Sequence, residues 1–437
     1  MNMISILLFE FTHFRRNKSK VFSYLLFLLA CLYAIYNGFE LQKKQQDTIQ
    51  AIKQEQQEEI GKVKAWFEEG KKGPEDRAWV DIHEPYWSLR YTPTFEIKQS
   101  SVLLPLGIGQ AEHYGYYKEV TFWSTTYDKD MVEEIANPER LVNGNIDFSF
   151  LVIYLLPLLL IILTYNVGGL EKDAGFDKLI TIQFGSLSKW LGVRFAFYVA
   201  LLLSTVVLLI LGVAFLNNGL SLLPSELGAL IFLSTGYILS FAAIFFLVLL
   251  YGASSSSIAF NMIATWLLLC LLVPGAVHQY ASMKVPVNYM TDYLDVNRKE
   301  TYATYSLPSD SLSKRLLSIY PKVAETKHGQ EAKPKDKIVR RSVGAIINEM
   351  NKAAVVKIEE KNESKNQLIR SSYWFNPIPF VQNQWNSYTS SDYYSYQRYR
   401  VEVQKTIVKK MELLVFDTWN KKRIEQEAYE QYIQELK

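Results

Sequence analysis

Apolar positions in this chain are concentrated in a few long blocks, and the charged residues occupy the stretches between them. A helix rises 1.5 Å per residue, so about 20 apolar residues are needed to cross the hydrocarbon core of a membrane. Five segments meet this requirement: 21–41, 148–167, 191–216, 227–251 and 258–280. From Leu227 to Met283 there is no Asp, Glu, Lys or Arg, and the turn residues 252–257 divide this run into a hairpin. The pattern predicts a membrane all-α bundle with five transmembrane helices.

The orientation of the bundle follows from basic residues in the short flanks of the spans. A basic cluster that begins with Arg15 and Arg16 precedes the first span, which predicts a cytoplasmic N-terminus. Crossing span by span then places 42–147 and 281–437 outside the cell and the loop 168–190 inside. The inner loop carries three lysines, whereas the outer loop 217–226 carries no Lys or Arg. Both assignments agree with an excess of positive charge on the inner side.

The first 20 residues predict an amphipathic helix. Apolar residues recur at helical spacing, whereas Glu10 and His13 lie off that face. The apolar set is Ile4, Leu7, Leu8, Phe11 and Phe14. We expect an elbow helix that lies on the inner membrane surface and turns into the first span at the basic cluster. The alternative is a simple cytoplasmic extension of that span.

The first outer region, 42–147, is expected to be α+β. Residues 42–70 are rich in Gln, Glu and Lys without proline, so they predict a helix that continues outward from the first span and ends at Gly70. An aromatic, proline-containing stretch follows and predicts β-rich or irregular structure. Its aromatic residues predict either the core of a small domain or an exposed ligand patch.

The second outer region, 281–437, is expected to be mainly α-helical. A Tyr-rich part at its start predicts irregular structure, and long helical patterns follow at 335–371 and 392–437. Pro377 and Pro379 predict the turn between these helices. The second pattern is amphipathic and too polar to cross a membrane, and we expect it to lead back toward the bilayer.

Composition and motifs limit the chemistry available to this chain. The formal net charge of +3 is too small for a nucleic-acid binder, and the two cysteines lie in apolar blocks, where we expect buried hydrophobes. There is no P-loop, no His-Glu-x-x-His and no Gly-x-Ser-x-Gly in the sequence, and the five histidines are scattered. We therefore expect no catalytic site, no metal site and no cofactor in this chain. Arg194, the one charged residue within the third span, is expected to extend to the inner interface.

The inner loop 168–190 is the largest predicted cytoplasmic surface after the N-terminal helix. It is partly apolar, with Phe176, Leu179 and Ile180 among charged residues. This pattern predicts a short helix whose apolar side either docks a soluble partner or rests against the lipid.

Several short stretches resemble permease subunits of type-2 ABC exporters. The stretches are Gly144-Asn145-Ile146-Asp147-Phe148 with the apolar run after it, Glu171 to Gly175 with the turn Gly185-Ser186-Leu187-Ser188, and Val102 to Gln110. The resemblance is to the bacterial branch with large inserted outer domains, related to gliding-motility and nitrous-oxide-reductase maturation permeases. The N-terminal helix with Arg15 and Arg16 looks like the elbow helix of that family.

The resemblance implies partners, a location and a set of site residues. Residues 171–187 would form a coupling helix that docks on a separate ATPase subunit, with ATP and Mg²⁺ bound in that partner. The implied coupling residues are Glu171, Asp173, Gly175, Phe176, Leu179 and Ile180, and the implied elbow residues are Phe11, Phe14, Arg15 and Arg16. Two permeases, identical or related, and two ATPases would form the transporter in the bacterial cytoplasmic (inner) membrane.

The sequence departs from this family in two places. Phe176 stands where the family usually has threonine. The relatives with two outer domains normally end in a sixth span, which we expect after residue 437 or from a neighbouring subunit.

An apolar bundle suits export of a hydrophobic or amphipathic cargo. The alternatives are a mechanotransmitting subunit that passes ATPase-driven force to an extracytoplasmic envelope protein, and a membrane receptor or scaffold without an ATPase.

Overall fold

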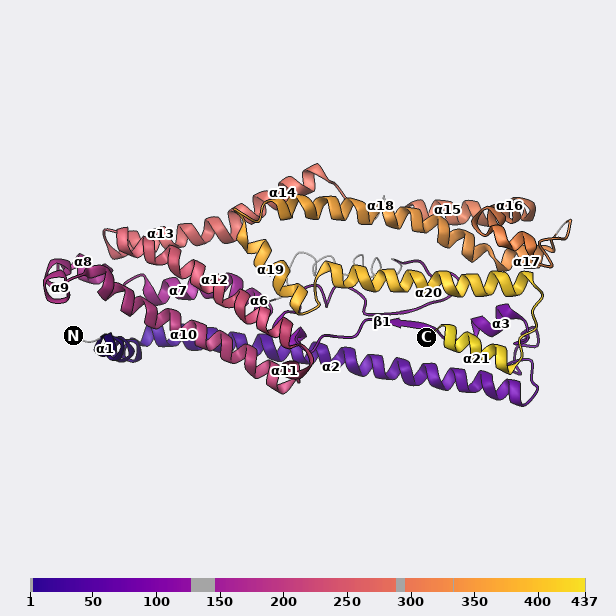
Figure 1. Ribbon diagram of the computed structural model, residues 1–437, viewed down its shortest axis with the longest axis horizontal. Helices are drawn as coiled ribbons and strands as arrows, with labels where there is room; N and C mark the ends of the chain where they lie inside the picture. The colour runs from indigo at the N-terminus through magenta and orange to yellow at the C-terminus, as the bar shows by residue number, and fades with distance from the viewer. Residues whose placement is uncertain (1–2, 127–145, 288–294, 333, 437) are drawn as a thin grey trace.

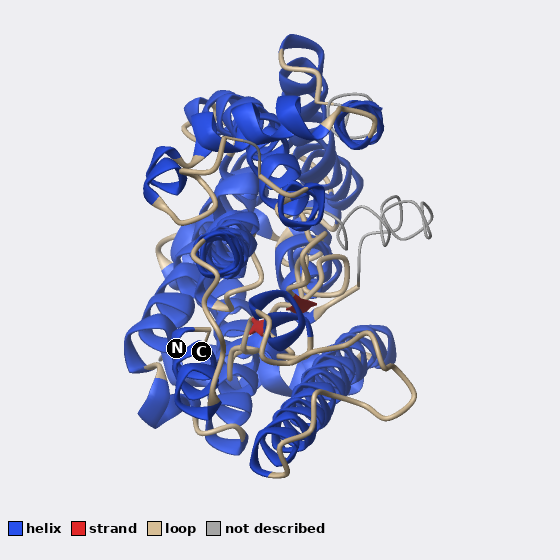
Figure 2. Ribbon diagram, turned by 90° about the vertical axis from the view of Figure 1, so that its right-hand side faces the viewer, coloured by secondary structure: helices blue, strands red, loops and turns tan. Residues whose placement is uncertain are grey.

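The computed structural model describes residues 3–126, 146–287, 295–332 and 334–436. The helices lie mostly along one long axis, so the molecule is elongated, with the N-terminal helix at one end (Figure 1). Seen along that axis, many of the helices appear end-on (Figure 2). One half, which we call the apolar bundle, contains the long apolar helices. The other half, which we call the distal domain, contains amphipathic helices and a small sheet.

The apolar bundle is formed by the predicted spans and the short helices that connect them. Its elements are α1 (Met3–Arg16), the first half of α2 (Lys18–Glu68), α6 (Phe148–Phe150), the π-helical η2 (Leu151–Leu155), α7 (Leu156–Thr164), α8 (Gly169–Asp173), α9 (Asp177–Phe184), α10 (Leu187–Leu216), α11 (Gly219–Leu222), α12 (Pro224–Tyr251), α13 (Ser255–Leu267), the π-helical η3 (Leu268–Leu272) and α14 (Val273–Lys284). Among the described residues, four helices are long and apolar enough to cross a membrane: α2, α10, α12 and the continuous helix Ser255–Lys284. The chain is therefore a membrane protein with helical spans.

The predicted span 148–167 forms a shorter apolar helix than expected, running from Phe148 to Thr164. It ends because the chain turns before Gly168, whose φ of +82° lies in the left-handed region. The helix is surrounded by α2, α10, α12 and α13, and most of its side chains are buried. It is thus the central helix of the apolar bundle.

The distal domain is built from segments that precede and follow the spans. Its elements are the second half of α2, α3 (Pro85–Arg90), β1 (Phe95–Ile97), the 3₁₀ turn η1 (Leu104–Leu106), β2 (Tyr117–Glu119), α15 (Asp295–Tyr305), α16 (Ser309–Ile319), the 3₁₀ turn η5 (Pro321–Glu325), α17 (Asp336–Arg341), α18 (Val343–Ser371), α19 (Pro377–Tyr388), α20 (Tyr393–Trp419) and α21 (Gln426–Glu435). The strands pair antiparallel, with Phe95 opposite Glu119 and Ile97 opposite Tyr117. The described residues 42–126 thus contain helical segments and one small two-stranded sheet.

Helix α2 joins the two halves without a break. It has 51 residues, which at 1.5 Å per residue gives a length of about 76 Å. It ends where Gly70 adopts a φ of +65°, as the sequence predicts. Its first half is apolar and its second half is solvated, so one rigid element extends from the apolar bundle to the far end of the distal domain (Figure 1).

A loop that we call the junction loop, residues 101–111, packs between the two halves. It crosses α2 at Gly38, where a Cβ atom would lie only 2.5 Å from Cα of Pro105. The buried carboxylate of Asp147 caps the central helix by accepting from the backbone N–H of Phe150 at 2.8 Å. Its other oxygen accepts from the backbone N–H groups of Ile108 at 2.8 Å and Gly109 at 3.2 Å. Two stretches that carry the family resemblance therefore meet at one carboxylate.

Three expectations for the second outer region are wrong. The segment before residue 335, expected to be irregular, contains α15 and α16, because tertiary packing stabilises helices with weak local preference. Pro377 opens helix α19, since proline fits the first helical turn, where its missing N–H has no partner to lose. The pattern 392–437 forms two helices, α20 and α21, and α20 runs away from the apolar bundle (Figure 1).

The aromatic residues of the first outer region pack mainly as the core of the distal domain. Phe122 is buried and its ring lies 5.1 Å from that of Tyr86. Tyr91 meets the ring of Trp66 on α2 at 5.6 Å. These rings contact the buried cluster that includes Met411 and Trp419 of α20. The domain-core interpretation is therefore favoured over the ligand patch.

A buried lysine connects α20 to the sheet. Nζ of Lys410 donates to the carbonyl oxygens of Thr92 at 3.0 Å and Val120 at 2.8 Å, and to Oγ1 of Thr94 at 3.0 Å. Burial lowers the pKa of Lys410 to about 7, against an ordinary value of 10.5. The unfolded chain therefore binds more protons than the folded chain between about pH 7 and pH 10.5, and stability contributed by this group rises with pH over that window.

We predict that Lys410→Met destabilises the protein by about 3 kcal/mol, because it leaves buried acceptors without a donor. The same variant should lose part of the rise in stability between about pH 7 and pH 9. Thermal unfolding of the purified full chain at both pH values measures both effects. Lys409→Met, at the neighbouring exposed position, is the matched control and should unfold like wild type. An unchanged pH dependence in Lys410→Met would contradict the assignment.

Candidate functional site

The predicted coupling loop lies at the end of the apolar bundle that also carries α1 (Figure 1). The expected single helix 171–187 is divided in two. Gly175 adopts a φ of +71° and separates α8 from α9, and Gly185, also at +71°, ends α9 before α10 begins. No neighbouring atom lies within 4 Å of a Cβ built at Gly175, so the backbone conformation requires glycine there and packing does not.

Two charged side chains of α8 hold this loop to the tight hairpin between α12 and α13. Nζ of Lys172 donates to the carbonyl oxygens of Leu249, Leu250 and Gly252, at 3.2, 3.1 and 2.7 Å. It therefore caps the C-terminal end of α12, where carbonyl groups lack helical partners. Oδ2 of Asp173 accepts from Oγ of Ser255 at 2.5 Å, at the first turn of α13. Asp173 and Lys172 thus connect the loop to the ends of two long helices.

The α9 face consists of Phe176, Leu179 and Ile182. These side chains are 56%, 50% and 82% exposed, and their spacing of three residues places them on one side of the helix. Ile180 is partly buried against the protein. Exposed apolar side chains on a short helix anchored at its base form a surface suited to a partner or to lipid. The side chain of the predicted coupling residue Glu171 lies outside the described residues.

Helix α1 packs with its polar side inward. The predicted apolar residues from Ile4 to Phe11 are exposed, with Phe11 at 51%, whereas Glu10 is fully buried. Phe14 is half-buried, and its ring contacts those of Tyr24 and Tyr198. Arg15 and Arg16 are exposed at the turn into α2. This arrangement agrees with an elbow helix that presents its apolar face to lipid and its polar face to the bundle.

A buried ion pair joins α1 to α10. Oε2 of Glu10 lies 2.5 Å from Nε of Arg194, and Oε1 accepts from the hydroxyl of Tyr198 at 2.6 Å. Nζ of Lys20 donates to the same hydroxyl at 3.0 Å. The guanidinium of Arg194 also lies 4.4 Å from the ring centroid of Trp190. All four polar groups are buried or nearly so, and they form one connected network.

Arg194 does not extend into solvent, since it is only 4% exposed and is buried against Glu10 of α1. A guanidinium at this depth is stabilised by a carboxylate more effectively than by partial exposure. Sequence reasoning missed the pair because Glu10 was assigned to the solvated side of α1. The sequence does contain a signal for this pair. Glu10 is the one acidic residue before Glu40, and Arg194 is the one charged residue in the third span.

No family model, no curated protein and no solved structure matches the chain. Within the described residues, no group of His, Cys, Asp and Glu side chains is arranged to hold a metal ion. Cys31 and Cys270 are both buried thiols in the apolar bundle, as expected.

We predict that Glu10→Gln destabilises the protein by about 3–5 kcal/mol, because the charge of Arg194 then remains buried without its counter-ion. Replacing both partners, Glu10→Leu with Arg194→Leu, should recover most of that loss. The unfolding midpoint of the purified protein measures both changes. Glu40→Gln, at an exposed position on α2, is the control. If Glu10→Gln unfolds within a few tenths of a kcal/mol of wild type, the pair does not hold α1 in place.

Proposed function

We propose that this chain is the permease subunit of an ATP-driven ABC exporter and receives its energy from a separate ATPase subunit at the α9 face. ATP and Mg²⁺ are bound and used in that partner, and this chain carries out no catalysis. Two ATPase subunits act on two permeases, identical or related. The chain is placed in a bacterial inner membrane, with its N-terminus and the α8–α9 loop in the cytoplasm and the distal domain outside.

The observation that carries this proposal is the combination of an exposed apolar face with a rigid base. The α9 face presents Phe176, Leu179 and Ile182, whereas Lys172 and Asp173 bind the ends of α12 and α13. A partner that moves α9 would therefore act on α8 across the turn at Gly175, and through Lys172 and Asp173 of α8 on the ends of two long apolar helices. Helices of this kind respond to such displacement by moving as rigid bodies, which is how a transporter changes the side to which it opens.

Export of a hydrophobic or amphipathic cargo is the first form of this proposal. The interior of the apolar bundle supports it: in the part of the chain that the structure describes, large apolar side chains pack at its centre and the buried ion pair of Glu10 and Arg194 lies at the α1 end. Pathways for ions and protons usually carry ionisable residues along their length.

Mechanotransmission is the alternative, and one observation favours it. Helix α2 is continuous from the apolar bundle to the far end of the distal domain, so a tilt of the span moves that end by a larger distance. In this form the same ATPase acts, but the distal domain passes force to an extracytoplasmic envelope protein. A receptor or scaffold without any ATPase is a further alternative.

We predict that Ile182→Asp and Phe176→Asp reduce binding of the ATPase subunit at least about tenfold, because each buries a charge in an apolar contact. The chain is expressed from a genomic segment that includes its neighbouring reading frames, and the ATPase that co-purifies is quantified. Trp79→Asp, which changes a 69% exposed residue of the distal domain, is the control and should leave binding intact.

Equal recovery of the ATPase with all three variants would contradict docking at the α9 face. Absence of any co-purifying ATPase would favour the receptor or scaffold. A transport assay with reconstituted vesicles separates the two remaining functions. ATP-dependent movement of lipid-like cargo supports export, whereas ATP hydrolysis without cargo movement supports force transmission.

A further inference from the structure

Residues 371–391, which we call the uncharged segment, differ in composition from the helices around them. Between Arg370 and Asp392 the sequence contains no Asp, Glu, Lys, Arg or His, although charged residues make up 21% of the chain. The segment contains the last residue of α18, a turn and the whole of α19. Its composition and its position along the spans together indicate where this part of the chain lies.

Helix α19 lies beside the apolar helices and not beyond their ends (Figure 1). The ring centroids of Trp385 and Phe148 are 6.0 Å apart, at the end of the central helix that is nearest to the distal domain. Three residues earlier in α19, Gln382 accepts from the hydroxyl of Tyr154 at 3.0 Å. Tyr154 is six residues from Phe148, which in a helix is about 9 Å deeper in the apolar bundle. The N-terminal end of α19 is therefore its deep end.

Contacts with the last span give a similar depth. Helix α19 contacts η3, which ends eight residues before Tyr280, the last residue of the predicted span 258–280. Eight residues of helix correspond to about 12 Å. The buried side of α19 carries Ile378, Val381 and Trp385, which belong to the same buried cluster as the spans. The start of α19 and the turn before it thus lie at the level of the apolar part of the spans.

The exposed side of α19 changes from apolar to polar along its length. Pro377, Phe380, Asn383 and Ser387 are exposed and recur at helical spacing. The two apolar members lie toward the deep end, and the two polar members lie toward the distal domain. A helix that enters a bilayer from the aqueous side needs this gradient, because polar groups are costly only within the hydrocarbon.

The turn between α18 and α19 presents two aromatic rings away from the protein. Trp374 is 85% exposed and Phe375 is 43% exposed, and their ring centroids are 4.9 Å apart in an edge-to-face arrangement. These rings continue the apolar outer surface of the spans, on which Phe232 of α12 is 81% exposed. Tryptophan is enriched at the boundary of the hydrocarbon core, where one part of its ring contacts acyl chains and its N–H faces the headgroups.

The backbone of the turn suits surroundings without water. The N–H groups of Phe375 and Asn376 donate to the carbonyl oxygen of Ser372 at 3.0 and 2.9 Å. Helix α19 begins with Pro377, and Pro379 follows in the same turn, so neither position has an N–H group. The first N–H groups of a helix have no helical partner, and hydrocarbon cannot provide one. The two prolines therefore remove donors that lipid would leave unpaired.

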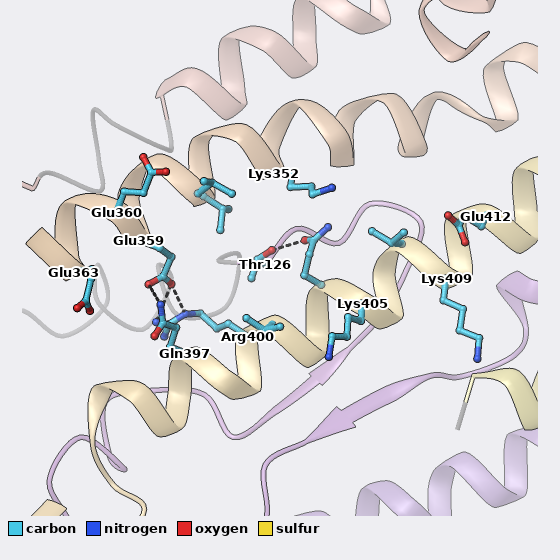
Figure 3. A pocket seen from close by; sticks show the side chains of 15 residues that line it. Thr126, Lys352, Glu359, Glu360, Glu363, Gln397, Arg400, Lys405, Lys409 and Glu412 are labelled. Carbon is cyan, nitrogen blue, oxygen red and sulfur yellow. Dashed lines mark hydrogen bonds and ion pairs between the residues drawn. The ribbon is translucent and has the colours of Figure 1, made fainter. Parts of the chain in front are cut away.

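The charge nearest to the turn is directed away from it. Nη1 of Arg370 lies 3.7 Å from Oε1 of Glu363, two turns back along α18, and the guanidinium lies 4.7 Å from the ring centroid of Tyr394. The aliphatic part of an arginine can lie beside lipid when its charge reaches a polar level in this way. Farther along α18 the surface is rich in charge, as in the groove with α20 that Lys352 helps to line (Figure 3). The surface of α18 thus changes from charged to uncharged toward the turn.

We propose that the turn between α18 and α19 is a lipid-contact site. Trp374, Phe375 and Phe380 pack against acyl chains just below the headgroups of the leaflet that faces the distal domain. The partner is the bilayer itself, and the contact attaches the distal domain to the membrane at a point separate from the spans. Part of the region 281–437, all of which the sequence analysis places outside the membrane, therefore enters it.

The test measures the depth of nitroxide spin labels on the full chain in nanodiscs of zwitterionic phosphatidylcholine. Labels are attached in separate variants at Trp374→Cys, Phe380→Cys and Ser387→Cys. Cys31 and Cys270 are buried, so wild type taken through the same labelling gives the background. Power-saturation electron paramagnetic resonance measures collisions of each label with oxygen, which concentrates in hydrocarbon, and with a neutral nickel chelate, which stays in water.

We expect the ratio of oxygen to nickel collisions at Trp374→Cys and Phe380→Cys to exceed that at Trp79→Cys at least about threefold, because the polar chelate is excluded from hydrocarbon. Trp79, which is 69% exposed, is the matched aqueous control, and Phe232→Cys on α12 is the lipid control. Ser387→Cys, two turns from Phe380 on the same face, should give a lower ratio than Phe380→Cys. Unfolding midpoints close to wild type confirm that the labelled variants fold.

Three results would overturn the proposal. A ratio at Trp374→Cys equal to that at Trp79→Cys would place the turn in water. Few collisions with either reagent would show that protein, such as a second copy of this chain, covers the turn in place of lipid. Equal ratios at Phe380→Cys and Ser387→Cys would contradict the depth gradient along α19. None of these outcomes depends on an ATPase, so the test is independent of the proposed permease function.

Discussion

The arrangement of the two halves depends on the hydrogen bonds that the buried carboxylate of Asp147 accepts. It caps the N-terminus of the central helix and at the same time accepts two backbone N–H groups from the junction loop. Burying a carboxylate is costly unless hydrogen bonds satisfy it, and here Ser149 adds a further donor at 2.7 Å. The central helix and the junction loop can therefore form this structure only together.

The junction loop then determines where the other elements lie. The carbonyl oxygen of Leu106 accepts from the indole of Trp385, which places α19 against the apolar bundle. Gln42 of α2 donates to the carbonyl oxygen of Ser101, and Asn217 at the end of α10 donates to Gln42. Polar side chains on α2 and α19 and at the end of α10 thus bind this loop. This joins the distal domain to the bundle without a flexible linker.

At the opposite end of the bundle, a second set of buried polar groups has the same effect. Glu10, Arg194 and Tyr198 hold α1 against α10, and Lys172 holds α8 against the end of α12. Glu10, Arg194 and Lys172 are charged groups stabilised by specific partners, and they connect short surface helices to long apolar ones. A force applied to α1 or to the α9 face therefore acts on the long helices, and through α2 and the junction loop on the distal domain.

The sequence by itself determined the elements whose signal is local. Long apolar blocks can lower their free energy only by burial or by contact with lipid, so the spanning helices, the hairpin at 252–257 and the end of α2 at Gly70 could be predicted. The apolar side chains of the α9 face could be predicted for the same reason. Only the tertiary structure decided which polar groups meet. Residues far apart in the chain meet in the Glu10–Arg194 pair, in the hydrogen bonds of Asp147 and in those of Lys410. Helix periodicity carries no information on such pairs. Likewise, α16 forms because neighbouring helices bury its face with Leu312 and Leu316. Helix α20 separates from α21 because Lys421 adopts a φ of +55° and directs α21 back onto α2.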